Sequence, residues 1–156
     1  MIKVIKIILA IAGAVFIILQ FIPYGRPVNR PVAGNDLLEV TETPDEVKVL
    51  LKNACYDCHS QKVAFPWYSK VAPVSWLVSS DIKEGREHLD FGIWKDYSKK
   101  EKLKLLDKIG DEVSEGNMPL KIYIAMHKEA RLSQEQRNQV TQWAENLAEE
   151  ILEEKR

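Results

Sequence analysis

The 156-residue sequence has little cysteine and histidine: its only cysteines are Cys55 and Cys58, and its histidines are His59, His88 and His127. A structural zinc site usually takes four Cys or Cys/His ligands from paired clusters. The three histidines stand at irregular distances, so the composition disfavours zinc. The chain also has no phosphate-binding loop, no acid and base pair, and no nucleophile beside its base. We therefore do not expect an enzyme that works through its side chains alone.

Acidic residues are missing from the first 35 positions, where the charged residues are Lys3, Lys6, Arg26 and Arg30. All 23 acidic residues, but only 18 of the 22 basic ones, lie from Asp36 onward, which gives that part of the chain a net charge of −5. A protein that binds nucleic acid usually carries a basic surface. Nucleic acid is therefore not an expected partner.

An apolar run from Ile7 to Ile22 has Gln20 as its only polar side chain. As a helix this run would span about 24 Å, less than the roughly 30 Å of a bilayer core, so it is either a membrane anchor that uses flanking residues or the core of a signal peptide. We favour an uncleaved anchor over residues 1–22, because no A-x-A cleavage pattern follows the run. Lys3 and Lys6 favour an N-terminus inside the cell, with the rest of the chain outside the cytoplasmic membrane.

The rest of the chain divides into a tether and one domain. Residues 23–42 are rich in proline and predict an extended tether rather than a folded element. Residues 43–156 show no alternating strand pattern and no repeat, and they predict an all-α domain.

Four helices are expected in this domain. The first begins with a capping box of Thr43 and Glu46 and runs into Cys55, and the second begins near Pro73 and ends before Gly85. The third begins with a capping box of Ser98 and Glu101 and stops at Gly116, and the fourth begins with a capping box of Ser133 and Gln136. The apolar positions at helical spacing are, in chain order, Val47, Leu50, Leu51 and Ala54; Val74, Leu77, Val78 and Ile82; Leu103, Leu106, Ile109 and Val113; and Val140, Trp143, Ala144, Leu147 and Ile151.

The two cysteines belong to the stretch Cys55-Tyr56-Asp57-Cys58-His59, which has C-x-x-C-H spacing. Two thiols three positions apart can each form a thioether to one porphyrin, and a histidine directly after the second thiol can then ligate the iron. A thioredoxin-type pair should begin a helix after a strand, whereas a helical pattern precedes this one. A structural disulfide gives no reason for the histidine. We therefore expect one covalent haem c, bound by Cys55 and Cys58, with His59 as metal ligand.

The second iron ligand is expected to be Met118, in Gly116-Asn117-Met118-Pro119-Leu120. Glycine and asparagine permit a turn and proline stiffens the backbone, so this stretch would present a soft thioether on a rigid loop. The alternatives are a gap-filling core methionine at this position, or Met126, His88 or His127 as the ligand.

Two aromatic segments resist assignment to helices. They are Gln61–Val71, which contains Phe65 and Trp67, and Leu89–Tyr97, which contains Phe91 and Trp94. Both are expected to be loops. Their aromatic side chains either enclose a haem edge or fill an ordinary core.

Several stretches carry a family resemblance: Cys55-Tyr56-Asp57-Cys58-His59-Ser60, Pro66-Trp67-Tyr68-Ser69, Ala72-Pro73-Val74-Ser75-Trp76-Leu77, Glu84-Gly85-Arg86, Asn117-Met118-Pro119 and His127-Lys128-Glu129-Ala130-Arg131-Leu132-Ser133. With them, residues 23–143 resemble the small bacterial family of haem-binding domains with a single C-x-x-C-H motif, a cytochrome c-like group that often carries an N-terminal anchor. The resemblance implies covalent haem at Cys55 and Cys58, with His59 and Met118 as axial ligands. It implies no reaction.

The expected function is that of a membrane-tethered c-type cytochrome, which carries single electrons between redox partner proteins at the outer face of the cytoplasmic membrane. Iron with His and Met ligands has no open position for oxygen or peroxide. One alternative is a haem sensor or peroxidase-like enzyme in which Met118 leaves the iron. Another is a structural subunit whose haem does not turn over.

Overall fold

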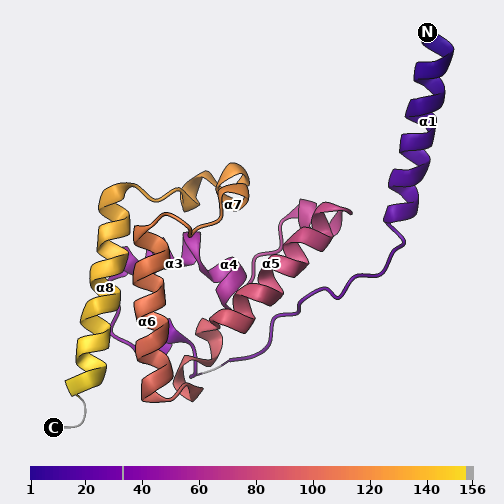
Figure 1. Cartoon of the computed structure of the whole chain (residues 1–156). Helices are drawn as coiled ribbons and strands as arrows, with labels where there is room; N and C mark the ends of the chain where they lie inside the picture. The colour runs from indigo at the N-terminus through magenta and orange to yellow at the C-terminus, as the bar shows by residue number, and fades with distance from the viewer. Residues whose placement is uncertain (33, 154–156) are drawn as a thin grey trace.

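The structure is a computed structural model that describes residues 1–32 and 34–153, and within these ranges it contains helices and no strand. An isolated N-terminal helix is followed by an extended segment and a helical domain (Figure 1). The elements are α1 (Ile2–Leu19), α2 (Leu37–Val40), α3 (Asp45–Ala54), α4 (Tyr56–His59), η1 (Trp67–Lys70), α5 (Val74–His88), η2 (Phe91–Asp96), α6 (Lys99–Ser114), α7 (Lys121–Met126), η3 (Lys128–Ala130) and α8 (Gln134–Glu153).

The core of the domain lies between α3, α6 and α8. Helices α6 and α8 run antiparallel and side by side, and α3 packs against α8 (Figure 1). The positions predicted to be apolar and inward-facing are buried in α3 and α8, and in α6 all are buried except Leu103, which is partly buried. Periodicity sufficed for these helices because each has one apolar face and one solvated face.

Two of the three predicted capping boxes are present. Ser98 and Glu101 cap α6 reciprocally, and Ser133 and Gln136 do the same for α8. The box predicted at Thr43 is wrong: α3 starts after Pro44 without a side-chain cap, and the Thr43 hydroxyl bonds that of Thr41 instead. The Thr41 hydroxyl, two residues away, takes the place of the backbone N–H of Glu46 as the partner of the Thr43 hydroxyl.

Helix α5 buries only part of the face predicted for it. Ile82 is buried and Val78 is partly buried as predicted, but Val74 and Leu77 are 42% and 43% exposed. The other buried residues of the helix are Ser75, Ser79 and Gly85. The helix also continues through Gly85 to His88. Small residues are buried here because α5 approaches α4 and η1 closely, which an apolar-periodicity rule does not anticipate.

The proline-rich segment is bonded to the domain along much of its length. Asn29 exchanges two hydrogen bonds of 3.0 Å with the backbone of Val63. Further on, the buried Asp36 caps α2, whose Leu37 is fully buried in the core. The prediction of an extended tether without a folded element is therefore corrected: the segment is extended at first, but α2 belongs to the domain core.

The two aromatic segments contain short 3-10 helices, η1 and η2, where loops were expected. Phe91 and Trp94 of η2 are each 1% exposed and belong to the core, so these two aromatics fill the domain interior. Trp67 of η1, by contrast, is 75% exposed. The two segments therefore have different roles.

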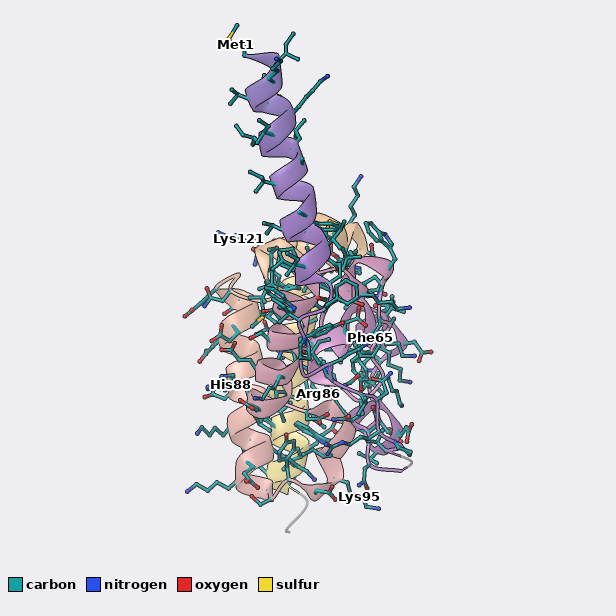
Figure 2. All side chains as sticks on the ribbon, turned by 90° about the vertical axis from the view of Figure 1, so that its right-hand side faces the viewer. Met1, Phe65, Arg86, His88, Lys95 and Lys121 are labelled. Carbon is teal, nitrogen blue, oxygen red and sulfur yellow. The ribbon has the colours of Figure 1, made fainter. Side chains whose placement is uncertain are left out.

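Helix α1 projects from the domain, and none of its residues is buried (Figure 2). Its 18 residues have a mean hydropathy of 2.6, which is enough by length and composition to cross a membrane or to act as a signal sequence. At its end, the Gln20 side chain donates to the carbonyl of Ala72 (3.1 Å) and accepts from the Ala72 N–H (3.0 Å).

Candidate functional site

The C-x-x-C-H motif folds as a single helical turn, α4. The N–H groups of Cys58 and His59 both donate to the carbonyl of Cys55, at 3.2 and 2.9 Å. Residues three apart in such a turn lie on the same side, so the two thiols are presented together. The two sulfurs are not bonded to each other.

His59 is oriented by backbone carbonyls. Its Nδ1 lies 3.0 Å from the carbonyl oxygens of both Gly85 and Leu89. Carbonyl oxygens only accept, so Nδ1 must carry the proton, and the neutral ring then has its lone pair on Nε2. No hydrogen bond from any described residue reaches Nε2. Burial lowers the pKa of His59, which keeps the ring neutral. A neutral imidazole whose second nitrogen donates to a carbonyl is the form that binds metal.

The motif environment keeps both thiols protonated. Burial is the main reason that the pKa of Cys55 and of Cys58 is raised to about 12, and the carboxyl groups of Asp81 and Asp57 add to the shift of Cys58. A thioredoxin-type pair needs the opposite shift, because its nucleophile is a thiolate of low pKa. The environment of these cysteines therefore disfavours disulfide exchange chemistry.

Helix α5 packs directly on the motif backbone through Gly85. A Cβ at position 85 would lie 2.9 Å from the carbonyl oxygen of Cys58, closer than real Cβ contacts allow. One residue on, Arg86 donates from Nε to the carbonyl of Ser60 (2.9 Å), which ends the motif turn, and from Nη1 to that of Val28 (3.0 Å). The pair Gly85-Arg86 therefore joins α5, the motif and the extended segment.

A second group of polar side chains connects α7 to the motif. The Tyr123 hydroxyl donates to a carboxylate oxygen of Asp57 (3.0 Å), inside the motif. The Tyr123 ring stacks on His127 at 4.2 Å between centroids. His127 Nδ1 donates to Glu129 (3.1 Å), so Nε2 can accept from the hydroxyl of Tyr68. Sequence reasoning missed this network, although Tyr68 and His127 both lie in the family-like stretches.

Met118 lies on the loop between α6 and α7 and is held by its backbone. Its N–H donates to the carbonyl of Glu112 (3.0 Å), and its carbonyl accepts from Arg137 (2.9 Å). Gly116, at φ +77°, makes the turn that ends α6. The Met118 side chain is half-buried and packs against the same apolar core as Cys55.

The rival ligands lie in other environments. Both ring nitrogens of His127 are already engaged, by Tyr68 and Glu129. Met126 is 58% exposed at the end of α7. His88 is exposed at the last position of α5 (Figure 2).

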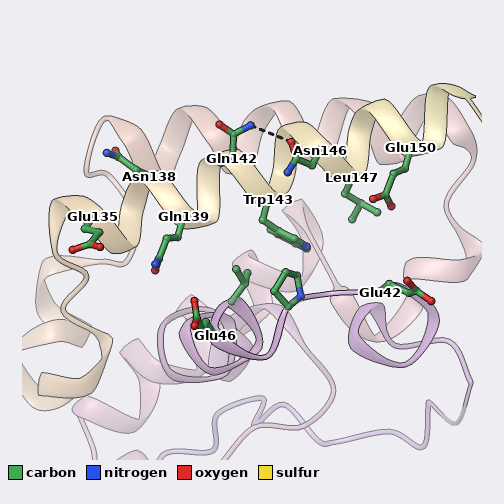
Figure 3. Close-up of a pocket in the computed structure, with 12 residues that line it drawn as sticks. Glu42, Glu46, Glu135, Asn138, Gln139, Gln142, Trp143, Asn146, Leu147 and Glu150 are labelled. Carbon is green, nitrogen blue, oxygen red and sulfur yellow. Dashed lines mark hydrogen bonds between the residues drawn. The ribbon is translucent and has the colours of Figure 1, made fainter.

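Two open grooves occur on the surface of the domain. One lies between α8 and the start of α3 and contains the carboxylates of Glu42, Glu46, Glu135 and Glu150, but no residue of the motif (Figure 3). The other borders the motif and is lined by Asp57 and by residues of the Tyr123–His127 network. The second groove is therefore the one associated with the site.

Comparison with known proteins assigns a family. Residues 14–146 match the family described as "Haem-binding domain". No curated protein matches the chain, and no solved structure matches it. The match includes the last third of α1 as well as the motif, the Met118 loop and most of α8. Since it spans most of the sequence, the chain belongs to the haem-binding domain family.

Proposed function

We propose that the protein is a membrane-anchored c-type cytochrome that carries single electrons between redox partner proteins at the outer face of the cytoplasmic membrane. The observation that carries the proposal is the tautomer of His59, whose lone pair is on Nε2 and which belongs to the same helical turn as the two thiols. When bound, the haem supplies a one-electron redox couple. The protein would supply the attachment points of the haem, its orientation and its environment.

The residues present fit a covalent haem. Cys55 and Cys58 offer two protonated thiols on the same side of α4, the form that adds across a vinyl group. Gly85 leaves no room for a side chain between α5 and the motif, so the ligand His59 is held by its neighbours and not by a flexible loop.

Met118 is proposed as the second axial ligand. A thioether is a soft ligand that favours the reduced state and raises the potential. Three backbone restraints support this role, because Glu112, Arg137 and the Gly116 turn hold the loop from different sides. A ligand on a restrained loop leaves the iron less readily than one on a mobile loop.

The N-terminal segment is proposed to remain as an anchor. The family match begins at residue 14, inside α1. Gln20, Tyr24 and Gly25 all hydrogen-bond to the segment from Ser69 to Ser79. Cleavage after the apolar run would remove the first of these contacts. The net negative charge of the chain from Asp36 onward supports docking to a partner protein with a basic patch.

The direct test is expression of the full chain with a c-type maturation system, followed by haem staining of a denaturing gel and a redox titration. We expect a stained band at the size of the chain and a reversible one-electron transition. The Cys55→Ala, Cys58→Ala double variant should lose the stain. His59→Ala should lose the native haem spectrum, whereas the matched variant His88→Ala should keep both.

Two results would contradict the proposal. A mature protein with both sulfurs unmodified, or joined to each other, would exclude covalent haem. Ready binding of carbon monoxide to the reduced protein at neutral pH would indicate an open iron position, and the function would then be that of a sensor or peroxidase-like enzyme.

A further inference from the structure

We propose that one corner of the haem domain lies in the headgroup region of the bilayer that α1 crosses, and that it binds anionic phospholipid. This anchor corner consists of Phe21, Ile22, Arg26, Trp67 and Lys70. The inference rests on the membrane anchoring in the proposed function and goes beyond it, because it assigns the domain a fixed orientation on the membrane.

The first argument is the connection between α1 and the domain. Gln20, one residue past α1, pairs with both backbone groups of Ala72. Tyr24 then donates to the carbonyl of Ser69 (3.3 Å). A residue that ends a membrane helix lies at the depth of the headgroups. The backbone of residues 69–72 is therefore held at that same depth.

The second argument is exposed apolar and aromatic surface beside this connection. Trp67 is 75% exposed, Phe21 81% and Ile22 45%. Trp67 lies in η1, directly before the residues that bond Gln20 and Tyr24. Tryptophan is enriched where a membrane meets water, since its ring is apolar and its N–H is polar. Insertion into a lipid surface would remove these apolar and aromatic side chains from water.

The third argument is charge. Residues 20–27 and 63–80 contain two basic residues, Arg26 and Lys70, and no acidic residue, although the chain from Asp36 onward carries −5. Both side chains are exposed, and Arg26 lies over the ring of Phe65 at 4.6 Å. Basic residues next to a membrane helix attract anionic lipid. Anionic lipid therefore fits this locally positive surface, although the domain as a whole is acidic.

The orientation has a consequence for the haem site. The segment after α1 is bonded along α5 by Ser79 to Gly25 and by Arg86 to Val28. These bonds hold α5, and the motif packed on Gly85, to the anchor. From Val74 to Gly85 the helix extends about 16 Å, so the motif is held close to the membrane surface and a partner must approach it there.

The test uses the full-length haem-loaded protein in vesicles of phosphatidylcholine and phosphatidylglycerol. A phosphatidylglycerol with a photoactivatable group near its headgroup is cross-linked, and the adducts are located by peptide mass spectrometry. We expect adducts on α1 and on the peptide that contains Trp67. The peptide that contains Lys95, at the end of the domain remote from α1 (Figure 2), should carry none.

Charge variants separate lipid binding from chance proximity. Lys70→Glu should lower the adducts on the Trp67 peptide about fivefold or more, because each basic residue near an anionic surface contributes roughly that factor. The matched variant Lys95→Glu should leave them unchanged. Gln20→Ala should also lower them, with the haem spectrum unchanged, because the domain is no longer held to α1.

The outcomes distinguish this inference from the proposed function. Adducts on α1 with none on the Trp67 peptide would overturn the orientation while leaving the anchor intact. Absence of adducts on α1 would overturn both the anchor and the orientation. Equal labelling of the two peptides would also overturn the proposal. So would the finding that a second copy of the chain covers the anchor corner in detergent. Haem absorbance of the same samples reports attachment separately.

Discussion

Gly85 and Cys58 are in backbone contact, since a Cβ at position 85 would lie 2.9 Å from the Cys58 carbonyl oxygen. This contact sets the distance between α5 and the motif. It also places the carbonyl of Gly85 3.0 Å from His59 Nδ1. Gly85 thus sets the packing of the motif and, together with the carbonyl of Leu89, the orientation of its histidine.

Gly85→Ala should therefore destabilise the protein. The added methyl group meets backbone, which cannot rotate away, so we expect a loss of about 1–3 kcal/mol in the free energy of unfolding and a shifted haem spectrum. Chemical denaturation of the haem-loaded protein measures the first effect. Gly110→Ala is the matched control, because the nearest atom to its Cβ is a Thr141 methyl at 3.7 Å. It should be neutral or stabilise by up to about 1 kcal/mol.

Arg137→Ala tests whether the Met118 loop is held from α8. The guanidinium donates to the carbonyls of Val113 (2.8 Å) and Met118 (2.9 Å). Its loss should loosen the loop, weaken the proposed bond between Met118 and the iron, and increase carbon monoxide binding to the reduced protein. Arg131→Ala, at an exposed position, is the control and should bind no more than the unmodified protein. An equal response of the two variants would contradict a positioning role for Arg137.

Arg86→Ala should cost about 1–3 kcal/mol of stability, because the buried carbonyl of Ser60 loses the donor that satisfies it. The same change releases the extended segment at Val28. Limited proteolysis should then cleave residues 23–35 faster. Lys83→Ala, exposed on the same helix, should leave both stability and cleavage unchanged.

Tyr123→Phe removes one hydroxyl and keeps the ring that stacks on His127. We expect a loss of about 1–2 kcal/mol, since a hydrogen bond to a charged group is lost. A double-mutant cycle with Asp57→Ala, which removes the accepting oxygens, isolates the pair. Strictly additive effects of the two single changes would show that α7 is not held to the motif by this bond.

Local sequence patterns predicted the structure wherever the conformation of a segment is set by its own residues. The C-x-x-C-H motif, the apolar stripes of α3, α6 and α8, and the caps at Ser98 and Ser133 are all readable from spacing, because their partners lie within one helical turn or on one face. The resemblance to a family of haem-binding domains, stated from the sequence, agrees with the match to the haem-binding domain family over residues 14–146.

Long-range packing was not readable in this way. Apart from the predicted Ile82, the buried face of α5 consists of Ser75, Ser79 and Gly85, which an apolar rule rejects, because close approach of two backbones selects for small side chains. Likewise, the extended segment looks like a linker, yet its Asn29 and Asp36 bond partners that lie 34 and 20 residues away in sequence.

The sequence by itself therefore determined the thiol pair, its histidine, the apolar N-terminal run and the helices with one apolar face, since these are local features of composition and period. Only the tertiary structure decided that His59 keeps its lone pair on Nε2, that α5 lies on the motif through Gly85, and that Gln20 holds α1 to the domain. Each of these depends on contacts between backbone groups that are distant in the sequence, and no local sequence pattern encodes such contacts.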